Sequence, residues 1–172
     1  MKKNNKILND KTEECSLGFF HSNSLTEVIT IFFGTFSFIG YLPFCPGTLA
    51  SLAILLILCF AGVSNSFILI SLAIVLFFIG VLVSFVLERE WGKDASKIVI
   101  DEVVGMLLSL VFLPMSFLVW GIAFLIFRIF DIVKPYPIRK IEKLKGGWGV
   151  MADDVLAGIY TAVIMNIIGR FS

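Results

Sequence analysis

Charged side chains are missing from three long stretches of this 172-residue chain. No Asp, Glu, Lys, Arg or His occurs in residues 28–87, in residues 103–127 or in residues 155–169. Uncharged runs of this length are typical of membrane-embedded helices and not of a soluble core. The composition agrees, because 58% of the residues are hydrophobic and the mean hydropathy is +0.97. We therefore predict a helical membrane protein and exclude an ordinary soluble domain.

Residue types that many catalytic and metal sites need are also scarce. The three cysteines form no CxxC motif and have no histidine cluster beside them, so neither a zinc site nor a disulfide framework is indicated. The single histidine, His21, lies in the polar N-terminal segment, which argues against a phosphohistidine enzyme. The chain has no P-loop ending in GK[ST], no cysteine phosphatase loop and no DxDxT motif. For phosphoryl chemistry, these absences leave metal-assisted attack by water as the leading route.

Cations are present but segregated along the chain. The formal net charge is +1, yet thirteen of the fourteen Lys and Arg residues lie in residues 2–11, 89–97 and 128–145, and only Arg170 lies elsewhere. The positive-inside rule places these three regions on the cytoplasmic side of a membrane. The basic excess of the third region would also attract anionic lipid. We therefore expect a multi-pass protein of a bacterial cytoplasmic membrane, with any site at these connectors facing the cytoplasm.

The breaks between apolar runs predict an all-α bundle with about five membrane-embedded helices, some of them short or re-entrant. Residues 1–24 are predicted to be a polar arm, and residues 25–172 a single membrane-embedded domain. Prolines and glycines divide the first apolar run into a segment near 25–42, a short helix near 48–61 and a full-length helix near 66–87. The final helix is predicted to start at the Asp153-Asp154 pair and to run to about residue 168.

Residues 103–127 are predicted to form a hairpin of two short helices broken at Pro114. A single crossing would put the charged connectors 88–102 and 128–154 on opposite faces, against the positive-inside rule. The hairpin arms are short for a hydrocarbon core of about 30 Å, so partial penetration or local thinning belongs to this prediction. For residues 25–42 an interfacial or re-entrant helix is preferred, because a span would put the lysine-bearing arm outside.

Four segments would then deliver polar groups to one boundary layer, where clustered carboxylates repel one another unless cations intervene. A hard divalent ion with oxygen ligands, Mg²⁺, relieves that repulsion. The acids could instead be simple helix caps, but a cap needs one acid, and two adjacent acid pairs favour a functional site. The candidate metal ligands are Asp101, Glu102, Asp153 and Asp154. Asp94 and Asp131 are candidates for a further ligand or for the base that activates water.

Cations at the same boundary predict a phosphate-binding site. Arg128, Asp131 and Lys134 follow at i, i+3 and i+6, so neighbouring members can form ion pairs before Pro135 ends the helix. Snorkelling at the membrane boundary is the alternative role for the two cations. Thr48 and Ser51, at the start of a helix, are further substrate-binding candidates. Arg139 is a weaker one, because it belongs to a basic group that is better explained as a solvated, lipid-facing surface.

Four motifs carry a family resemblance: PGTLAS (46–51), KDASKIVIDEVVG (93–105), FRIFDIVKPYPIRK (127–140) and GGWGVMADDVLAG (146–158). On these, the chain resembles the phosphatidylglycerophosphatase A family of bacterial Mg²⁺-dependent membrane lipid phosphatases. The resemblance covers about residues 46–158. Two departures are small, since Ala50 stands where the family often has Gly and Ala95 where Pro often follows the Asp.

The resemblance implies hydrolysis of phosphatidylglycerophosphate to phosphatidylglycerol and inorganic phosphate. The family's polar positions fall on Thr48, Ser51, Asp94, Asp101, Glu102, Arg128, Asp131, Lys134, Asp153 and Asp154. The expected partners are this substrate and membrane lipids, with no nucleic acid, and homo-oligomerisation is left open. Two alternatives of other classes are a cation-coupled membrane transporter and a non-catalytic scaffold for lipid-synthesis enzymes. Charges placed at helix ends, and not along a pathway, speak against a transporter. A scaffold would explain the basic belt but not the paired acids.

Overall fold

The computed structural model describes residues 24–92, 95–142, 144 and 146–171. Every element in this part of the chain is a helix, so the all-α prediction is confirmed. Asp94, a candidate base or ligand, lies outside the described residues. The elements are α2 (Ser24–Gly34), a 3-10 helix η1 (Ile39–Tyr41), α3 (Pro46–Ala61), α4 (Ser66–Trp91), α5 (Ile100–Ser109), α6 (Phe117–Val133), α7 (Ile138–Ile141) and α8 (Gly147–Phe171).

Local signals explain most of the helix ends. α3 begins with Pro46, whose fixed φ suits a first helical position, and is followed by Gly62 in the left-handed conformation with φ 67°. Asn65 caps α4, because its side chain accepts a hydrogen bond of 2.9 Å from the backbone N–H of Phe67. The break expected at Pro114 is present, since α5 ends at Ser109 and α6 begins at Phe117.

The last helix differs from the prediction. α8 starts at Gly147, so the Asp153-Asp154 pair lies in its second turn and not at its start. Gly147 packs closely on the backbone of α4, where a Cβ would overlap the carbonyl of Val81. Tertiary contact with α4 therefore extends the helix backwards through residues of poor helical propensity.

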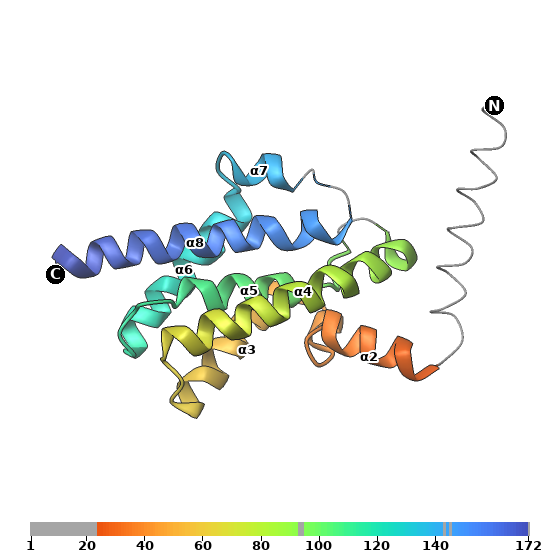
Figure 1. The fold of residues 1–172 in the computed structure, drawn as a ribbon, viewed down its shortest axis with the longest axis horizontal. Helices are drawn as coiled ribbons and strands as arrows, with labels where there is room; N and C mark the ends of the chain where they lie inside the picture. Colours follow the sequence, from red (N-terminus) through yellow and green to blue (C-terminus); the bar gives the residue numbers. More distant parts are fainter. Residues whose placement is uncertain (1–23, 93–94, 143, 145, 172) are drawn as a thin grey trace.

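α5 is the central element of the bundle. It packs against α3, α4, α6 and α8, and its contact with α8 is the most extensive in the structure (Figure 1). Two glycines allow this close approach: a Cβ on Gly105 would lie 2.6 Å from a ring carbon of Phe127 and 2.7 Å from the carbonyl oxygen of Asp154. On the other helix, a Cβ on Gly158 would overlap the carbonyl of Gly105. Small residues thus set the distance between the two helices that carry most of the acids.

The bundle has two distinct ends. At one end lie the C-terminal end of α4 and the N-terminal end of α8, while the C-terminal end of α8 lies at the other (Figure 1). Near that second end, the turn after α5 is tied to neighbours: Ser66 Oγ accepts a 2.9 Å bond from Phe112 N–H, and Asn166 donates one of 3.1 Å to the Val111 carbonyl. The end of α4 and the start of α8 therefore lie at the same end of the bundle.

Two helices are long and apolar enough to cross a membrane, α4 over Ser66–Trp91 and α8 over Gly147–Arg170. Only 28% of the apolar window of α4 is buried inside the protein, which suits a helix that faces lipid. α3 is apolar but shorter, and α2 contributes the apolar helix Leu25–Gly34. By length and composition, the described helices thus include two candidate spans, fewer than the five embedded helices that the sequence suggested.

Candidate functional site

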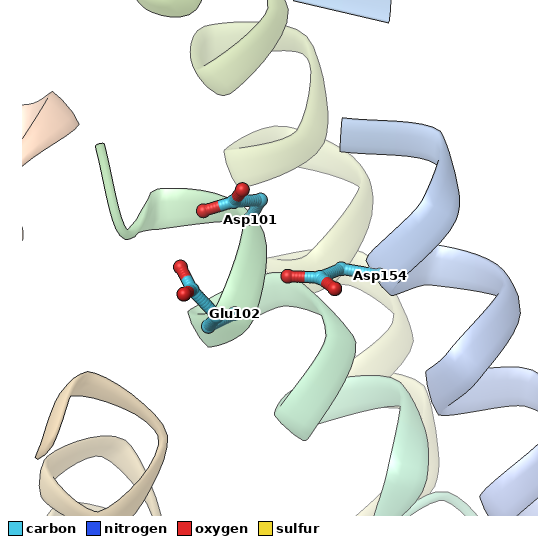
Figure 2. Close-up of side chains that lie close together, drawn as sticks. All are labelled: Asp101, Glu102 and Asp154. Atoms are coloured by element: carbon cyan, nitrogen blue, oxygen red, sulfur yellow. The ribbon is translucent and has the colours of Figure 1, made fainter. Parts of the chain in front are cut away.

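Three carboxylates from two helices form one cluster at the end of the bundle where α5 begins (Figure 2). Asp101 and Glu102 lie in the first turn of α5, and Asp154 faces them from the second turn of α8. One oxygen of each carboxylate lies within 4.8 Å of one oxygen of each of the others. The structure therefore brings together three of the four residues predicted as metal ligands.

The cluster is buried and short of hydrogen-bond partners. Asp154 is 3% exposed and Asp101 9% exposed. Oδ1 of Asp101 and Oε2 of Glu102 are buried and have no hydrogen-bond partner among the described residues. These two oxygens do not cap a helix, since a capping oxygen would accept a backbone N–H. Unpartnered buried carboxylate oxygens are costly unless a cation completes them.

The electrostatics of the first turn of α5 favour a cation. Burial raises the pKa of Asp101 well above its usual value, and the neighbouring Glu102 carboxylate raises it further. Burial also raises the pKa of Glu102, although its hydrogen bond with Asp101 lowers it in part. Burial and mutual repulsion of these carboxylates therefore favour the uptake of a proton or of a positive ion. An all-oxygen donor set of this kind fits Mg²⁺ better than a softer metal.

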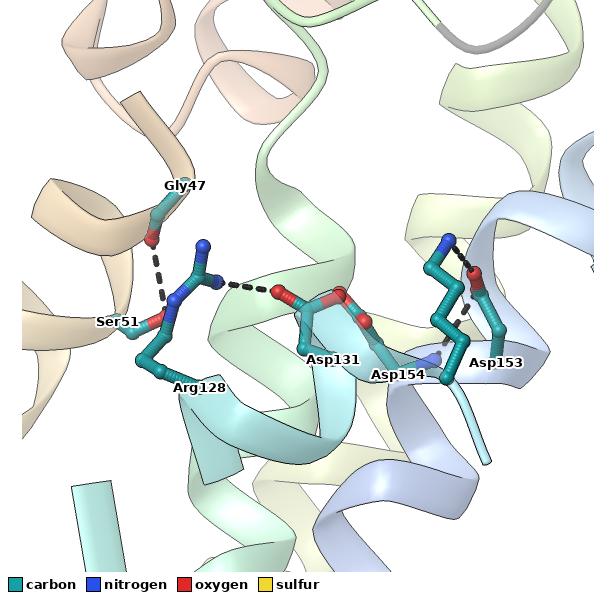
Figure 3. A network of polar contacts seen from close by, with 7 residues as sticks. Gly47, Ser51, Arg128, Asp131, Asp153 and Asp154 are labelled. Carbon is teal, nitrogen blue, oxygen red and sulfur yellow. Dashed lines mark hydrogen bonds and ion pairs between the residues drawn. The ribbon is translucent and has the colours of Figure 1, made fainter. Parts of the chain in front are cut away.

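Gly47 at the start of α3 forms one wall of the cluster. A Cβ on Gly47 would overlap the carboxylate of Glu102, so only glycine leaves room for that side chain. The backbone at Gly47 thus comes close to the Glu102 carboxylate. Ser51, one turn later, is fully buried and donates a 2.9 Å hydrogen bond to the carbonyl of Gly47 (Figure 3).

The predicted ion pair between Arg128 and Asp131 is confirmed near the end of α6. Nη1 of Arg128 lies 2.6 Å from Oδ2 of Asp131 (Figure 3). Asp131 also lies within hydrogen-bonding reach of Asp154 and is close enough to Glu102 to interact with its charge. Nε of Arg128 is buried and has no hydrogen-bond partner among the described residues. Arg128 therefore lies beside the acid cluster with a free donor.

Lys134 pairs with α8 and not with Asp131. The helix ends at Val133, and Lys134 takes the left-handed C-cap conformation with φ 45°, which turns its side chain away from the i+3 partner. Its Nζ donates a 2.7 Å hydrogen bond to Oδ2 of Asp153 and lies 3.5 Å from Glu142. Burial alone would lower the pKa of Lys134, but the hydrogen bond and charge of Asp153, with help from Glu142, raise it above its usual range. Lys134 is therefore a permanent cation near neutral pH.

Asp153 has both carboxylate oxygens occupied by protein donors. Oδ2 accepts from Lys134, and Oδ1 accepts a 3.1 Å hydrogen bond from the backbone N–H of Asp154. It is 4% exposed and lies outside the group of three acids that could share an ion. The Lys134–Asp153 pair therefore forms a second charged pair of the site, beside the acid cluster (Figure 3).

The remaining predicted residues are less closely tied to the cluster. Thr48 lies half-buried in the first turn of α3, and Arg139 is exposed on α7. Among the described residues, no hydrogen bond or ion pair links Thr48 or Arg139 to the acids. Sequence reasoning missed Glu142 as a second partner of Lys134, and no spacing signal could have found it, because the intervening chain turns through α7.

A separate cavity lies elsewhere on the protein. A cavity of about 660 Å³ is lined by residues of α4, α5 and the C-terminal half of α8, including Leu108, Ile159, Asn166 and Arg170. Its lining is mostly apolar, and it contains none of the clustered acids. The acid cluster, and not this cavity, therefore concentrates the groups that can do chemistry.

Comparisons with known proteins agree with the motifs. The sequence model of the family described as Phosphatidylglycerophosphatase A matches residues 32–169. A Bacteroides thetaiotaomicron protein whose name marks it provisionally as a phosphatidylinositol-3-phosphatase is 39% identical over 138 residues, covering 74% of this chain and 86% of its own. Phosphatidylglycerophosphatase A of Escherichia coli is 36% identical over 137 residues, covering 76% and 78%. The Haemophilus influenzae protein of the same name is 47% identical over 74 residues, covering 42% and 45%. No solved structure matches the chain.

Proposed function

The chain belongs to the phosphatidylglycerophosphatase A family, and from this premise we propose that it hydrolyses phosphatidylglycerophosphate to phosphatidylglycerol and inorganic phosphate. The observation that carries the proposal is the buried group of Asp101, Glu102 and Asp154 beside the Arg128–Asp131 pair. An acid cluster that needs a cation, next to an arginine with a free donor, suits a phosphomonoester.

Asp101, Glu102 and Asp154 are the residues that would hold Mg²⁺, which when bound supplies Lewis-acid stabilisation of charge on the phosphoryl oxygens. Arg128 binds a phosphoryl oxygen through its free Nε–H while Asp131 holds the guanidinium in place. Lys134 contributes a fixed positive charge, with its position set by Asp153. Together these groups offset the charge that grows on the phosphate in the transition state.

Hydrolysis needs a water oxygen to attack phosphorus while the ester oxygen leaves. Asp131 is the described residue best placed to take the proton of that water, because it lies beside both Asp154 and Glu102. The P–O bond to the glycerol head breaks, and the released alkoxide takes up a proton to give the hydroxyl of phosphatidylglycerol. Asp153, first predicted as a metal ligand, has the role of anchoring Lys134 in this proposal.

The proposed membrane arrangement is based on the end of the bundle that holds the acid cluster. We place α3, α4, α5, α6 and α8 in the cytoplasmic membrane of a bacterium, with the acid cluster facing the cytoplasm. The basic connectors at residues 89–97 and 128–145 support this orientation. α5, with ten residues, reaches only about 15 Å. It is therefore a re-entrant arm, and a substrate lipid reaches the site laterally from the inner leaflet.

The transporter alternative is not supported by the charge positions. The acids of the cluster sit in the first turn of α5 and the second turn of α8, and the runs that follow, residues 103–127 and 155–169, are uncharged. A cation pathway across the membrane would need polar groups along its length. The name of the Bacteroides relative raises a different question, namely which lipid head group carries the phosphomonoester.

The deciding experiment is phosphate release by the purified protein in mixed micelles, with Mg²⁺ and after removal of Mg²⁺ by a chelator. Phosphatidylglycerophosphate and phosphatidylinositol-3-phosphate are compared as substrates. We expect release from the former that disappears with the chelator, returns with Mg²⁺ and falls by at least 100-fold in Asp101→Asn and Asp154→Asn. Glu90→Gln, an acid-to-amide change at an exposed position near the end of α4, is the matched control and should retain most activity. Full activity in both acid variants would refute the metal assignment.

Faster phosphate release from phosphatidylinositol-3-phosphate would show that the protein prefers another lipid head group, while the proposed hydrolysis of a phosphomonoester would stand. Absence of phosphate release from either lipid by the wild type would refute the enzymatic proposal itself.

A further inference from the structure

The segment that leads into the metal-ligand pair has no helix of its own, yet it is deeply buried. Ile98 and Val99 are 4% and 0% exposed, and they lead directly into Ile100 and Asp101 at the start of α5. A segment outside regular structure depends on neighbouring elements for its position, because it lacks a helical hydrogen-bond ladder. The position of Asp101 and Glu102 therefore depends on whatever holds residues 97–99.

Those residues are held by α2 and η1. The backbone N–H of Val99 donates a 2.9 Å hydrogen bond to the carbonyl of Gly34, the last residue of α2. In η1, Gly40 packs so closely on the chain that a Cβ there would overlap the carbonyl of Lys97. One backbone hydrogen bond and one backbone contact thus fix the segment from the same side.

A side-chain contact adds to this grip. Nζ of Lys97 lies 5.1 Å from the ring centroid of Tyr41 and 5.6 Å from that of Trp91, and the two rings meet edge to face at 6.1 Å. Such cation–π contacts are worth about 0.5–1 kcal/mol each at exposed sites. They link η1, the end of α4 and the 97–99 segment in one small cluster.

The α2–η1 unit, residues 24–41, is itself firmly seated. α2 packs along α4 near the end where the site lies, with Gly34 pressed against Val83 and Leu87 (Figure 1). η1 packs against α3, whose Gly47 forms the wall beside Glu102. The turn between α2 and η1 is closed by fully buried Thr35, whose hydroxyl accepts from Phe38 N–H at 3.1 Å and whose carbonyl accepts from Gly40 N–H at 2.9 Å.

We propose that the α2–η1 unit is a positioning element for the metal ligands: it docks on residues 97–99 and thereby fixes Asp101 and Glu102 where Asp154 can share an ion with them. The inference rests on the proposed function, because it takes these acids as metal ligands. The unit touches neither ion nor substrate, so it acts through the segment that it holds. Its loss should weaken metal binding more than it slows the chemical step at saturating metal.

The test is Mn²⁺ binding to the purified full-length protein in detergent micelles, measured by electron paramagnetic resonance of free Mn²⁺. Mn²⁺ is the probe because it takes the same oxygen ligands as Mg²⁺. In Gly40→Ala the new Cβ must displace the Lys97 carbonyl, and we expect the Mn²⁺ Kd to rise by about 10- to 100-fold, the effect typical of residues that orient metal ligands. Phosphate release should then need correspondingly more Mg²⁺ while kcat at saturating Mg²⁺ changes little.

The matched control is Gly121→Ala, since a Cβ on Gly121 meets no atom within 4 Å. It makes the same chemical change on α6 and should leave the Kd unchanged. Circular dichroism and the melting temperature report whether each variant is folded. A purely structural role for Gly40 predicts a lower melting temperature with an unchanged Kd of the folded protein, and that result would overturn the inference.

Lys97→Met provides a second variant if Gly40→Ala does not fold. It keeps an apolar stem against the two rings and removes only the cation, so the Kd should rise about two- to fivefold, as expected for one exposed cation–π contact. An unchanged Kd in folded Lys97→Met, with Gly40→Ala unfolded or unchanged, contradicts the positioning role. If the wild-type protein does not bind Mn²⁺, both the metal site and this inference are refuted. If only the variants lose Mn²⁺ binding, the metal site stands and the positioning role is supported.

Discussion

The Lys134–Asp153 pair offers the sharpest test of how the site is built. Lys134 Nζ lies 2.7 Å from Oδ2 of Asp153, and the two side chains are 23% and 6% exposed. At that distance and an effective dielectric constant of about 20, the gross attraction is about 6 kcal/mol. Desolvation of the two ions offsets much of this. We expect a net coupling energy of about 2 kcal/mol, within the range of side chains in contact.

A double-mutant cycle of Lys134→Met, Asp153→Asn and the double variant measures this coupling. Lys134→Met alone should lower the free energy of unfolding by about 3 kcal/mol, because it leaves a buried carboxylate without its cation. The double variant should be less destabilised than the sum of the two single variants. Unfolding in detergent micelles, followed by circular dichroism, is the assay. A coupling energy below about 0.5 kcal/mol would refute the reasoning.

Glu142→Gln is the matched control, because Glu142 also contacts Lys134 but at 3.5 Å and with 37% of its side chain exposed. A partly exposed pair of this kind contributes under about 1 kcal/mol. The pH dependence follows from the raised pKa of Lys134. A cation whose pKa is raised in the folded state stabilises fully below its unfolded pKa of about 10.4, and the stabilisation is lost only as pH rises through the folded value. Lys134 should therefore cause no stability change between pH 6 and about pH 9.

The same variants separate anchoring from metal binding. Asp153→Asn should leave the Mn²⁺ Kd nearly unchanged and lower kcat, because it releases Lys134, whereas Asp154→Asn should raise the Kd by at least tenfold. Equal losses of Mn²⁺ binding in both variants would place Asp153 among the ligands, as the sequence alone suggested.

Two further predictions concern packing and topology. Gly105→Ala should lower the free energy of unfolding by about 1–3 kcal/mol, because its Cβ would meet Phe127 and the Asp154 carbonyl at 2.6–2.7 Å. The control Gly169→Ala lies in open space and should change the free energy of unfolding by no more than about 1 kcal/mol. Equal stabilities of the two variants would contradict the close α5–α8 contact. In a variant without the native cysteines, single cysteines at Gly92 and Glu142 should react with an impermeant thiol reagent from the cytoplasmic side, and one at Asn65 from the other side. Labelling of Gly92 and Glu142 from opposite sides would show that residues 103–127 cross the membrane once.

Much of the fold could be predicted from where charges and helix breakers stand. Pro46 and Gly62 bound α3 as expected, and Pro114 separates α5 from α6. These signals act within a few residues, so a single sequence is enough to read them. The start of α8 was wrong by six residues because tertiary contact with α4 overrides the weak propensity of Gly147 and Gly149.

The candidate site was predictable in its residue types but not in its partners. Asp101, Glu102 and Asp154 were marked because acids directly before apolar runs are expensive unless they have a role. The partner of Lys134 could not be read from the i, i+3 spacing, because that rule holds only while the helix continues. One left-handed residue at the C-cap redirects Lys134 from Asp131 to α8.

The two acid pairs look alike in the sequence, yet their side chains face different partners in the structure. Successive residues of a helix point about 100° apart, so two adjacent acids within a helix point in different directions. In α8, Asp154 therefore faces the acids of α5 while Asp153 faces Lys134. Asp101 and Glu102 of α5 reach one cluster despite this angle, because Gly47 leaves space for the longer Glu102 side chain. A Glu102→Asp exchange would shorten that reach, so the site needs the side-chain length of Glu102 as well as its charge.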